Sequence, residues 1–131
     1  MIVEDPVFLT LGEVIEIHRD QIERYGGDPG LRDLCLLQSA MAVPAAGFGG
    51  RYLHTDLFEM AAAYLFHIAQ NHPFVGGNKR TGAVASLVFL SLNNVELEAD
   101  EEDFESIVLG VAEGKIDKAS VAEFFRKNSR Y

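Results

Sequence analysis

The chain has 131 residues, a hydrophobic fraction of 48% and a formal net charge of −9 at pH 7. This length favours one domain with its own core, and the hydrophobic fraction excludes a disordered chain. The acidic balance argues against nonspecific binding to a nucleic-acid backbone or an anionic membrane surface. We therefore expect a single domain over residues 1–131, with neither nucleic acid nor membrane as a partner.

Cysteine usage and the N-terminus bear on the compartment. Cys35 is the only cysteine, so no internal disulfide can form, which fits a reducing environment. We expect Cys35 to be a small, buried apolar core residue between Leu34 and Leu36. The N-terminus lacks a basic segment followed by an apolar core, and no apolar run is long enough to cross a bilayer. These features predict a soluble cytoplasmic protein.

The N-terminal third predicts two helices separated by a turn. Thr10 and Glu13 have the spacing of a capping box at the start of the first helix. The residues expected to share its inner face are Val14, Ile15, His18 and Ile22. Glycines at 26–27 stop this helix, and a turn over 28–30 follows. A second helix is predicted over residues 33–41, and Pro44 prevents its continuation.

Residues 45–56 interrupt the helical pattern. The segment Phe48, Gly49, Gly50, Arg51 and Tyr52 has the glycine and aromatic content of a flexible loop or a short hairpin. A third helix opens at residue 56 and ends near residue 72, because the residue before a proline avoids the helical region. Its apolar stripe consists of Leu57, Ala61, Tyr64, Leu65 and Ile68.

The C-terminal half predicts three further helices. The fourth runs over residues 78–92 and is apolar on nearly every side, which is typical of a buried central helix. Residues 95–97 form a short extended piece, a fifth helix around residues 104–111 ends at 113–114, and Asp117 caps a sixth. Acidic residues at 100–103 favour the start of the fifth helix. The predicted fold is a compact all-α bundle of about six helices with a short flap loop.

The stretch NHPFVGGNKRT, residues 71–81, combines a histidine, glycines and two cations at the start of the fourth helix. Glycines let a ligand approach the backbone, and a helix N-terminus offers unpaired N–H donors to an anion such as phosphate. Lys79 and Arg80 add full positive charges there. The imidazole of His72 can accept a proton from an attacking hydroxyl. By spacing alone, a helix joint at which His72 merely caps the preceding helix is an equal alternative.

The same stretch resembles the signature of the Fic/Doc family, His-Pro-Phe-x-Asp/Glu-Gly-Asn-Gly/Lys-Arg. The flanking segments IHRDQIERYGG and DLFEMAAAYLFHIAQNHPF resemble the death-on-curing (Doc) branch, and the resemblance extends from about Leu9 to Phe125. It implies a small helical bundle that uses ATP and Mg²⁺. It also implies a toxin that transfers the γ-phosphate of ATP to a threonine of elongation factor Tu, which arrests translation.

The resemblance also implies roles for individual residues. His72 would be the general base, Phe74 would anchor the loop, Gly77 and Asn78 would contribute to the anion hole, and Arg80 would contact nucleotide phosphate. In the adenylylating Fic branch glycine stands where Lys79 stands here. Lysine at that place is typical of Doc proteins, and the resemblance implies a nucleotide that binds in the reversed orientation. AMP transfer by an adenylylating enzyme therefore remains as the less favoured alternative.

Gly76 departs from the family signature, which has Asp or Glu at this position to help hold Mg²⁺. Metal bridging contributes several kcal/mol of charge neutralisation in such reactions, so we expect weakened metal binding and an attenuated toxin. A metal held by phosphate and water alone is the other interpretation. An inactive domain that binds only nucleotide or antitoxin is a third functional hypothesis, and Gly76 favours it.

Partners and further sites complete the expectations. The resemblance implies a Phd-type antitoxin, since Thr55–Met60 fails to match the self-inhibitory motif of some Fic proteins at its last position. Residues 48–52 lie where family members carry a flap that docks the target as an added strand, although a plain loop is nearly as well supported. We expect no zinc site at His18, His54 and His67, because their spacing matches no zinc motif.

Overall fold

The computed structural model describes residues 5–131, and six helices within this range confirm the predicted all-α fold. The helices are α1 (Leu11–Tyr25), α2 (Leu34–Ala42), α3 (Leu57–Asn71), α4 (Asn78–Leu92), α5 (Glu101–Ala112) and α6 (Lys118–Lys127). Two short antiparallel pairs accompany them. They are β1 (Gly47–Phe48) with β2 (Arg51–Tyr52), and β3 (Glu96–Leu97) with β4 (Ser129–Arg130).

Side-chain caps explain where most of the helices begin. Thr10 and Glu13 form the predicted reciprocal capping box at the start of α1. Aspartates open four other helices by accepting a backbone N–H of the first turn: Asp33 at α2, Asp56 at α3, Asp100 at α5 and Asp117 at α6. The predicted boundaries therefore agree with the structure to within about two residues, apart from the start of α5.

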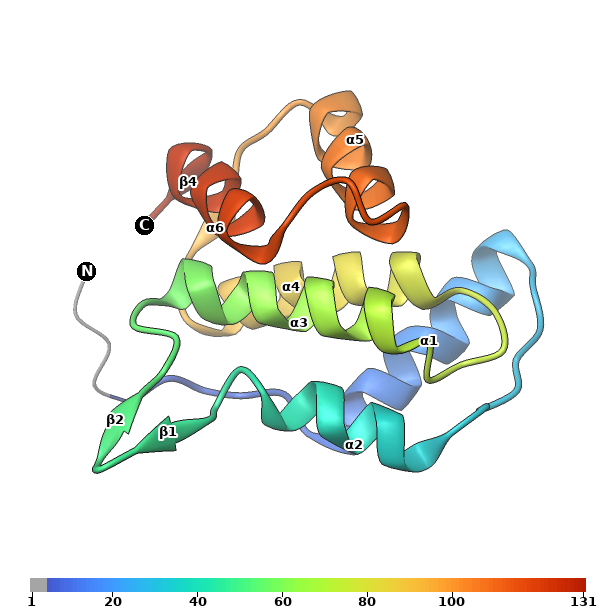
Figure 1. Ribbon diagram of the computed structural model, residues 1–131. Helices are drawn as coiled ribbons and strands as arrows, with labels where there is room; N and C mark the ends of the chain where they lie inside the picture. The colour runs from blue at the N-terminus through green and yellow to red at the C-terminus, as the bar shows by residue number, and fades with distance from the viewer. Residues whose placement is uncertain (1–4) are drawn as a thin grey trace.

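The antiparallel helices α3 and α4 form the centre of the bundle (Figure 1). Helices α5 and α6 cover one side of this pair, and α1 and α2 cover the other. Buried residues surround α3 on every side, beyond the predicted stripe. At Gly82 of α4 an added Cβ would lie 3.0 Å from the backbone oxygen of Leu65, so glycine lets the two central helices approach closely.

Two core predictions were wrong. Cys35 is exposed, because α2 packs through Leu37 and Ala40, and a residue two positions before Leu37 lies on a different face of the helix. Ile15 is 39% exposed, because α1 buries the neighbouring Val14 and the adjacent position points about 100° away.

Candidate functional site

The loop over residues 72–77 joins the two central helices at one end of the bundle (Figure 1). His72 ends α3 in a left-handed conformation, with φ of 49° and ψ of 55°, and its side chain is exposed. Pro73 cannot continue the helix. The histidine therefore does end the preceding helix, as one interpretation of the sequence held. Its imidazole makes no hydrogen bond with any of residues 5–131 and lies beside the loop.

The segment between α1 and α2 holds this loop in place. Pro73 O accepts hydrogen bonds from the backbone N–H groups of Arg32 and Asp33, at 2.8 and 3.0 Å. Val75 N donates to Gly30 O at 2.9 Å. The Arg32 guanidinium also donates to the carbonyls of the last turn of α3, at residues 71 and 72. These bonds hold together two loops that lie about 40 residues apart in the sequence.

Phe74 anchors the loop in the core. It is only 2% exposed, and its ring stacks on His18 with centroids 3.7 Å apart. The buried Asn78 side chain accepts from Phe74 N and donates to Phe74 O, both at 2.9 Å. The amide of Asn78 is thus engaged within the loop. The backbone N–H of Asn78, in the first turn of α4, is available to an anion.

His18 supports the loop from α1. Its Nε2 lies 2.8 Å from Gly76 O, and since a carbonyl only accepts, this nitrogen carries the proton and donates. We did not predict this role from the sequence, which placed His18 on an inner helix face without assigning a partner. The one signal of this role in the sequence is that a histidine lies on a helix face predicted to be otherwise apolar.

The N-terminus of α4 differs from the other helix starts. Gly77 precedes it with φ of 76°, a conformation that glycine adopts without strain, and offers no side chain to cap the helix. The other five helices in residues 5–131 each have a capping side chain. The first N–H groups of α4 have no intrahelical acceptor and, with the positive end of the helix dipole, are available to an anion.

Two cationic residues, Lys79 and Arg80, lie in the first turn of α4. Lys79 is exposed and makes no hydrogen bond or ion pair through its side chain with any of residues 5–131. Arg80 donates to Gly26 O at 2.8 Å, and its guanidinium lies 5.4 Å from the centre of the Tyr25 ring. Its Nε is buried and has no hydrogen-bond partner in the described part of the chain. A buried donor of this kind is costly unless a ligand satisfies it.

A cavity of about 330 Å³ opens between these groups. Its lining brings together all the predicted catalytic and phosphate-binding residues and Gly76: His72, Gly76, Gly77, Asn78, Lys79 and Arg80. A second cavity of about 350 Å³ shares Lys79 and Arg80 with it and extends toward Phe104 and Val108 of α5. Together they form adjoining hollows with two positive charges at their junction, which suits a ligand with phosphate at one end and an apolar group at the other.

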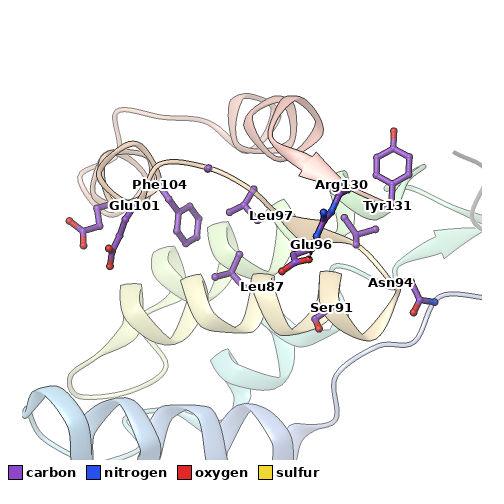
Figure 2. A pocket seen from close by; sticks show the side chains of 12 residues that line it. Leu87, Ser91, Asn94, Glu96, Leu97, Glu101, Phe104, Arg130 and Tyr131 are labelled. Carbon is purple, nitrogen blue, oxygen red and sulfur yellow. Dashed lines mark hydrogen bonds and ion pairs between the residues drawn. The ribbon is translucent and has the colours of Figure 1, made fainter.

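A larger cavity, of about 1040 Å³, lies between the C-terminal half of α4, β3, α5 and β4 (Figure 2). Its rim carries Glu96, Glu101 and Glu105, and its one cation, Arg130, pairs with Glu96 at 2.9 Å. The negative balance disfavours phosphate. We therefore place the candidate site at the smaller cavity beside the α3–α4 loop.

The predicted flap is a short hairpin, but the structure does not bring it to this cavity. Gly49 and Gly50 both have positive φ and form its turn, and Phe48 is 87% exposed. The hairpin precedes the start of α3, whereas His72 ends that helix (Figure 1). A helix of 15 residues is about 22 Å long, and this length separates the two. A docking role for the hairpin stays a prediction without support from its position.

The remaining histidines lie elsewhere. His54 lines a cavity with Lys118, and His67 accepts a hydrogen bond from Lys118 Nζ at 3.0 Å. Neither lies at the loop that His18 supports. Across residues 5–131, no cluster of three or more His, Cys, Asp or Glu side chains has an arrangement that could hold a metal ion. Within the same residues, none of the helices combines the length and the apolar character that crossing a membrane requires.

Comparisons with known proteins identify the family of the chain. The family model described as Fic/DOC family matches residues 8–90, which include α1 to α3, the loop and most of α4. The chain is 36% identical to "Protein kinase doc" of Escherichia phage P1 over 115 residues, covering 88% of this chain and 90% of that protein. It is 39% identical to "Toxin Doc" of Mycolicibacterium smegmatis over 100 residues, covering 75% and 77% respectively. The chain belongs to the Fic/Doc family.

Proposed function

We propose that this protein is a Doc-type toxin of a toxin–antitoxin module that transfers the γ-phosphate of ATP to a threonine of elongation factor Tu. The observation that supports this most is the uncapped N-terminus of α4, which shares its cavity with the His72 imidazole and two cations. The names "Protein kinase doc" and "Toxin Doc" of the two relatives point in the same direction.

In the proposed reaction, His72 takes the proton of the threonine hydroxyl as its oxygen attacks the γ-phosphorus. The bond between that phosphorus and the bridging β-phosphate oxygen breaks, and ADP leaves. The backbone N–H groups at residues 77–79 and the charges of Lys79 and Arg80 stabilise the transferring group. The unpartnered Nε of Arg80 fits such a contact, because phosphate would satisfy a donor that is otherwise buried without an acceptor.

Lys79 favours phosphate transfer over AMP transfer. It stands at the first turn of α4 and lines both adjoining cavities, so its side chain fills space that a glycine would leave open. By resemblance, that space holds a second phosphate pocket in adenylylating relatives. An ammonium group at this position would instead attract the phosphate end of a nucleotide whose base lies toward α5.

Mg²⁺ on the nucleotide would neutralise charge on the transferring group. The residues that line the cavity offer nitrogen donors for phosphate, but Gly76 contributes no carboxylate to the ion. The missing carboxylate at residue 76 favours a second candidate function, in which the domain binds nucleotide or antitoxin without catalysis. The proposed partner in either case is a Phd-type antitoxin.

Incubation with elongation factor Tu, Mg²⁺ and labelled ATP tests the proposal. We expect label on the target from γ-labelled ATP and none from α-labelled ATP. Label from the α position would contradict phosphate transfer and support adenylylation. No label from either, with nucleotide binding retained, would support the non-catalytic domain.

A further inference from the structure

Lys118, the first residue of α6, has an unusual partner for a lysine. Its Nζ lies 3.0 Å from Nε2 of His67 on α3, and it forms no ion pair with a carboxylate of any of residues 5–131. Lys115 and Lys127, by contrast, each have a glutamate oxygen near Nζ, at 3.6 and 3.7 Å. A carboxylate favours the protonated amine, whereas a neutral imidazole accepts from a charged or an uncharged amine alike.

A cavity of about 430 Å³ gives a small molecule access to Lys118, which is half-buried and forms part of its wall. The cavity contains two carboxylates, but other groups engage both of them. Glu59 accepts from the backbone N and Oγ1 of Thr55, each at 3.1 Å. Glu123 pairs with Arg126 at 2.8 Å. Neither acid therefore holds the proton of Lys118 through a direct contact.

The surroundings of Lys118 favour its unprotonated form. Burial lowers the pKa of Lys118, and the charge of Glu59 opposes this with a smaller effect. The positive end of the α6 dipole also disfavours a cation in the first turn. His54 in the same cavity adds no negative charge, and burial lowers its pKa as well. A larger fraction of Lys118 than of an ordinary lysine is therefore uncharged at neutral pH.

We propose that Lys118 is an acylation site, whose Nζ reacts with small acyl phosphates that enter the cavity beside it. The lone pair of the unprotonated Nζ attacks the carbonyl carbon and forms a C–N bond. The bond from that carbon to the bridging oxygen breaks, phosphate leaves with the electron pair, and Nζ releases a proton to solvent. The product is a neutral amide whose remaining N–H can still donate to His67.

This site is separate from the cavity beside the α3–α4 loop, and the inference does not depend on the proposed function. Acylation would remove the charge of Lys118 and place an apolar group between α3 and α6. The small side chains of Ala119 and Ala122 form part of the cavity wall and leave room for an acetyl group.

Reaction of the folded chain with acetyl phosphate, from neutral to alkaline pH, tests the proposal. Peptide mass spectrometry gives the acetylation rate of each lysine in the same sample. Lys115 and Lys127 are internal controls, because their side chains are 74% and 72% exposed and both pair with glutamate. At pH 7 we expect Lys118 to react at least about threefold faster than either control, and its rate to level off at a lower pH. A rate at Lys118 equal to or below those of both controls would overturn the proposal.

Two isosteric variants test the role of the neutral partner. His67→Gln keeps an uncharged acceptor for Lys118, whereas His67→Glu places a carboxylate there and raises the lysine pKa. We expect the Lys118 rate at pH 7 to stay within about twofold of the wild type in His67→Gln and to fall about fivefold or more in His67→Glu. The rates of Lys115 and Lys127 should not change. Equal rates at Lys118 in the two folded variants would contradict control by the neutral imidazole, and the comparison within the wild type decides the proposal if a variant does not fold.

Discussion

At the residue scale, His72 combines a structural position of its main chain with an exposed side chain. Its left-handed backbone ends α3, and its carbonyl accepts from Arg32 at 2.6 Å, so its main chain belongs to the joint between the helices. The imidazole itself is exposed and lines the cavity. The main chain that ends the helix and the side chain that lines the cavity are thus separable at this residue, which a sequence alone could not establish.

This separation predicts the behaviour of two variants that lack the imidazole. Left-handed backbone costs a residue with a Cβ, histidine and alanine alike, about 1 kcal/mol and costs glycine almost nothing. We expect His72→Ala to unfold in urea with a free energy within about 0.5 kcal/mol of that of the wild type, and His72→Gly to match or exceed the wild type. Both should keep the helical circular dichroism spectrum. Loss of helix in His72→Gly would show that the side chain holds the fold.

At the element scale, α6 packs on α3 through a polar contact. The pKa of His67 is lowered to about 4, first because burial disfavours the charged ring, and then because of Lys118 and His54 nearby. Lys118 Nζ donates to the neutral His67 ring, which suits an unprotonated acceptor. The interface between these helices therefore depends on a histidine that stays neutral.

The sign of the resulting pH dependence follows from the lowered pKa. As pH falls below about 6.5, unfolded chains bind a proton at His67, whereas folded chains resist it down to a pKa of about 4. Stability should therefore fall across this window. Partial exposure reduces the effect to about 1 kcal/mol between pH 7 and 5. Urea unfolding of the wild type and His67→Gln at both pH values should show this extra loss in the wild type alone.

The helices themselves could be predicted from local signals. Capping residues at 10, 33, 56, 100 and 117 and the stop at Pro73 depend on neighbouring residues only, so they are visible in sequence. The extended piece at 95–97 was also expected, but its pairing with Ser129–Arg130 was not, because it joins segments over 30 residues apart. Burial of Cys35 was wrong for a related reason, since which face of a short helix is covered depends on distant elements.

Only part of the candidate site could be predicted from the sequence. The family signature brought His72, Gly77 and the cations of α4 together, and the structure places them around one cavity. The supporting contacts of His18 and Arg32 come from α1 and the segment after it. They were missed because no spacing rule relates residues about 40 to 60 positions apart without knowledge of the fold.

At the scale of the whole molecule, the chain is acidic overall, but the N-terminus of α4 is uncapped and cationic and lies beside two adjoining cavities. This arrangement suits a protein whose activity is controlled by a partner. The Doc relatives imply an antitoxin partner. We propose that it is of the Phd type, and a segment of it that folds on binding would stabilise the toxin by mass action. We expect co-expression with the product of the adjacent small reading frame to give a complex that co-purifies. Its melting temperature should lie several degrees above that of the chain alone. A monomer that never associates with such a product would contradict this role.

The central claim is that the loop between α3 and α4 transfers phosphate with His72 as base. The intact mass of elongation factor Tu, measured after incubation with ATP and Mg²⁺, tests it most directly, with His72→Gly as the matched inactive protein. We predict a gain of one phosphate with the wild type and no change with the variant. A gain of AMP, or an equal gain of phosphate with both proteins, would contradict the account.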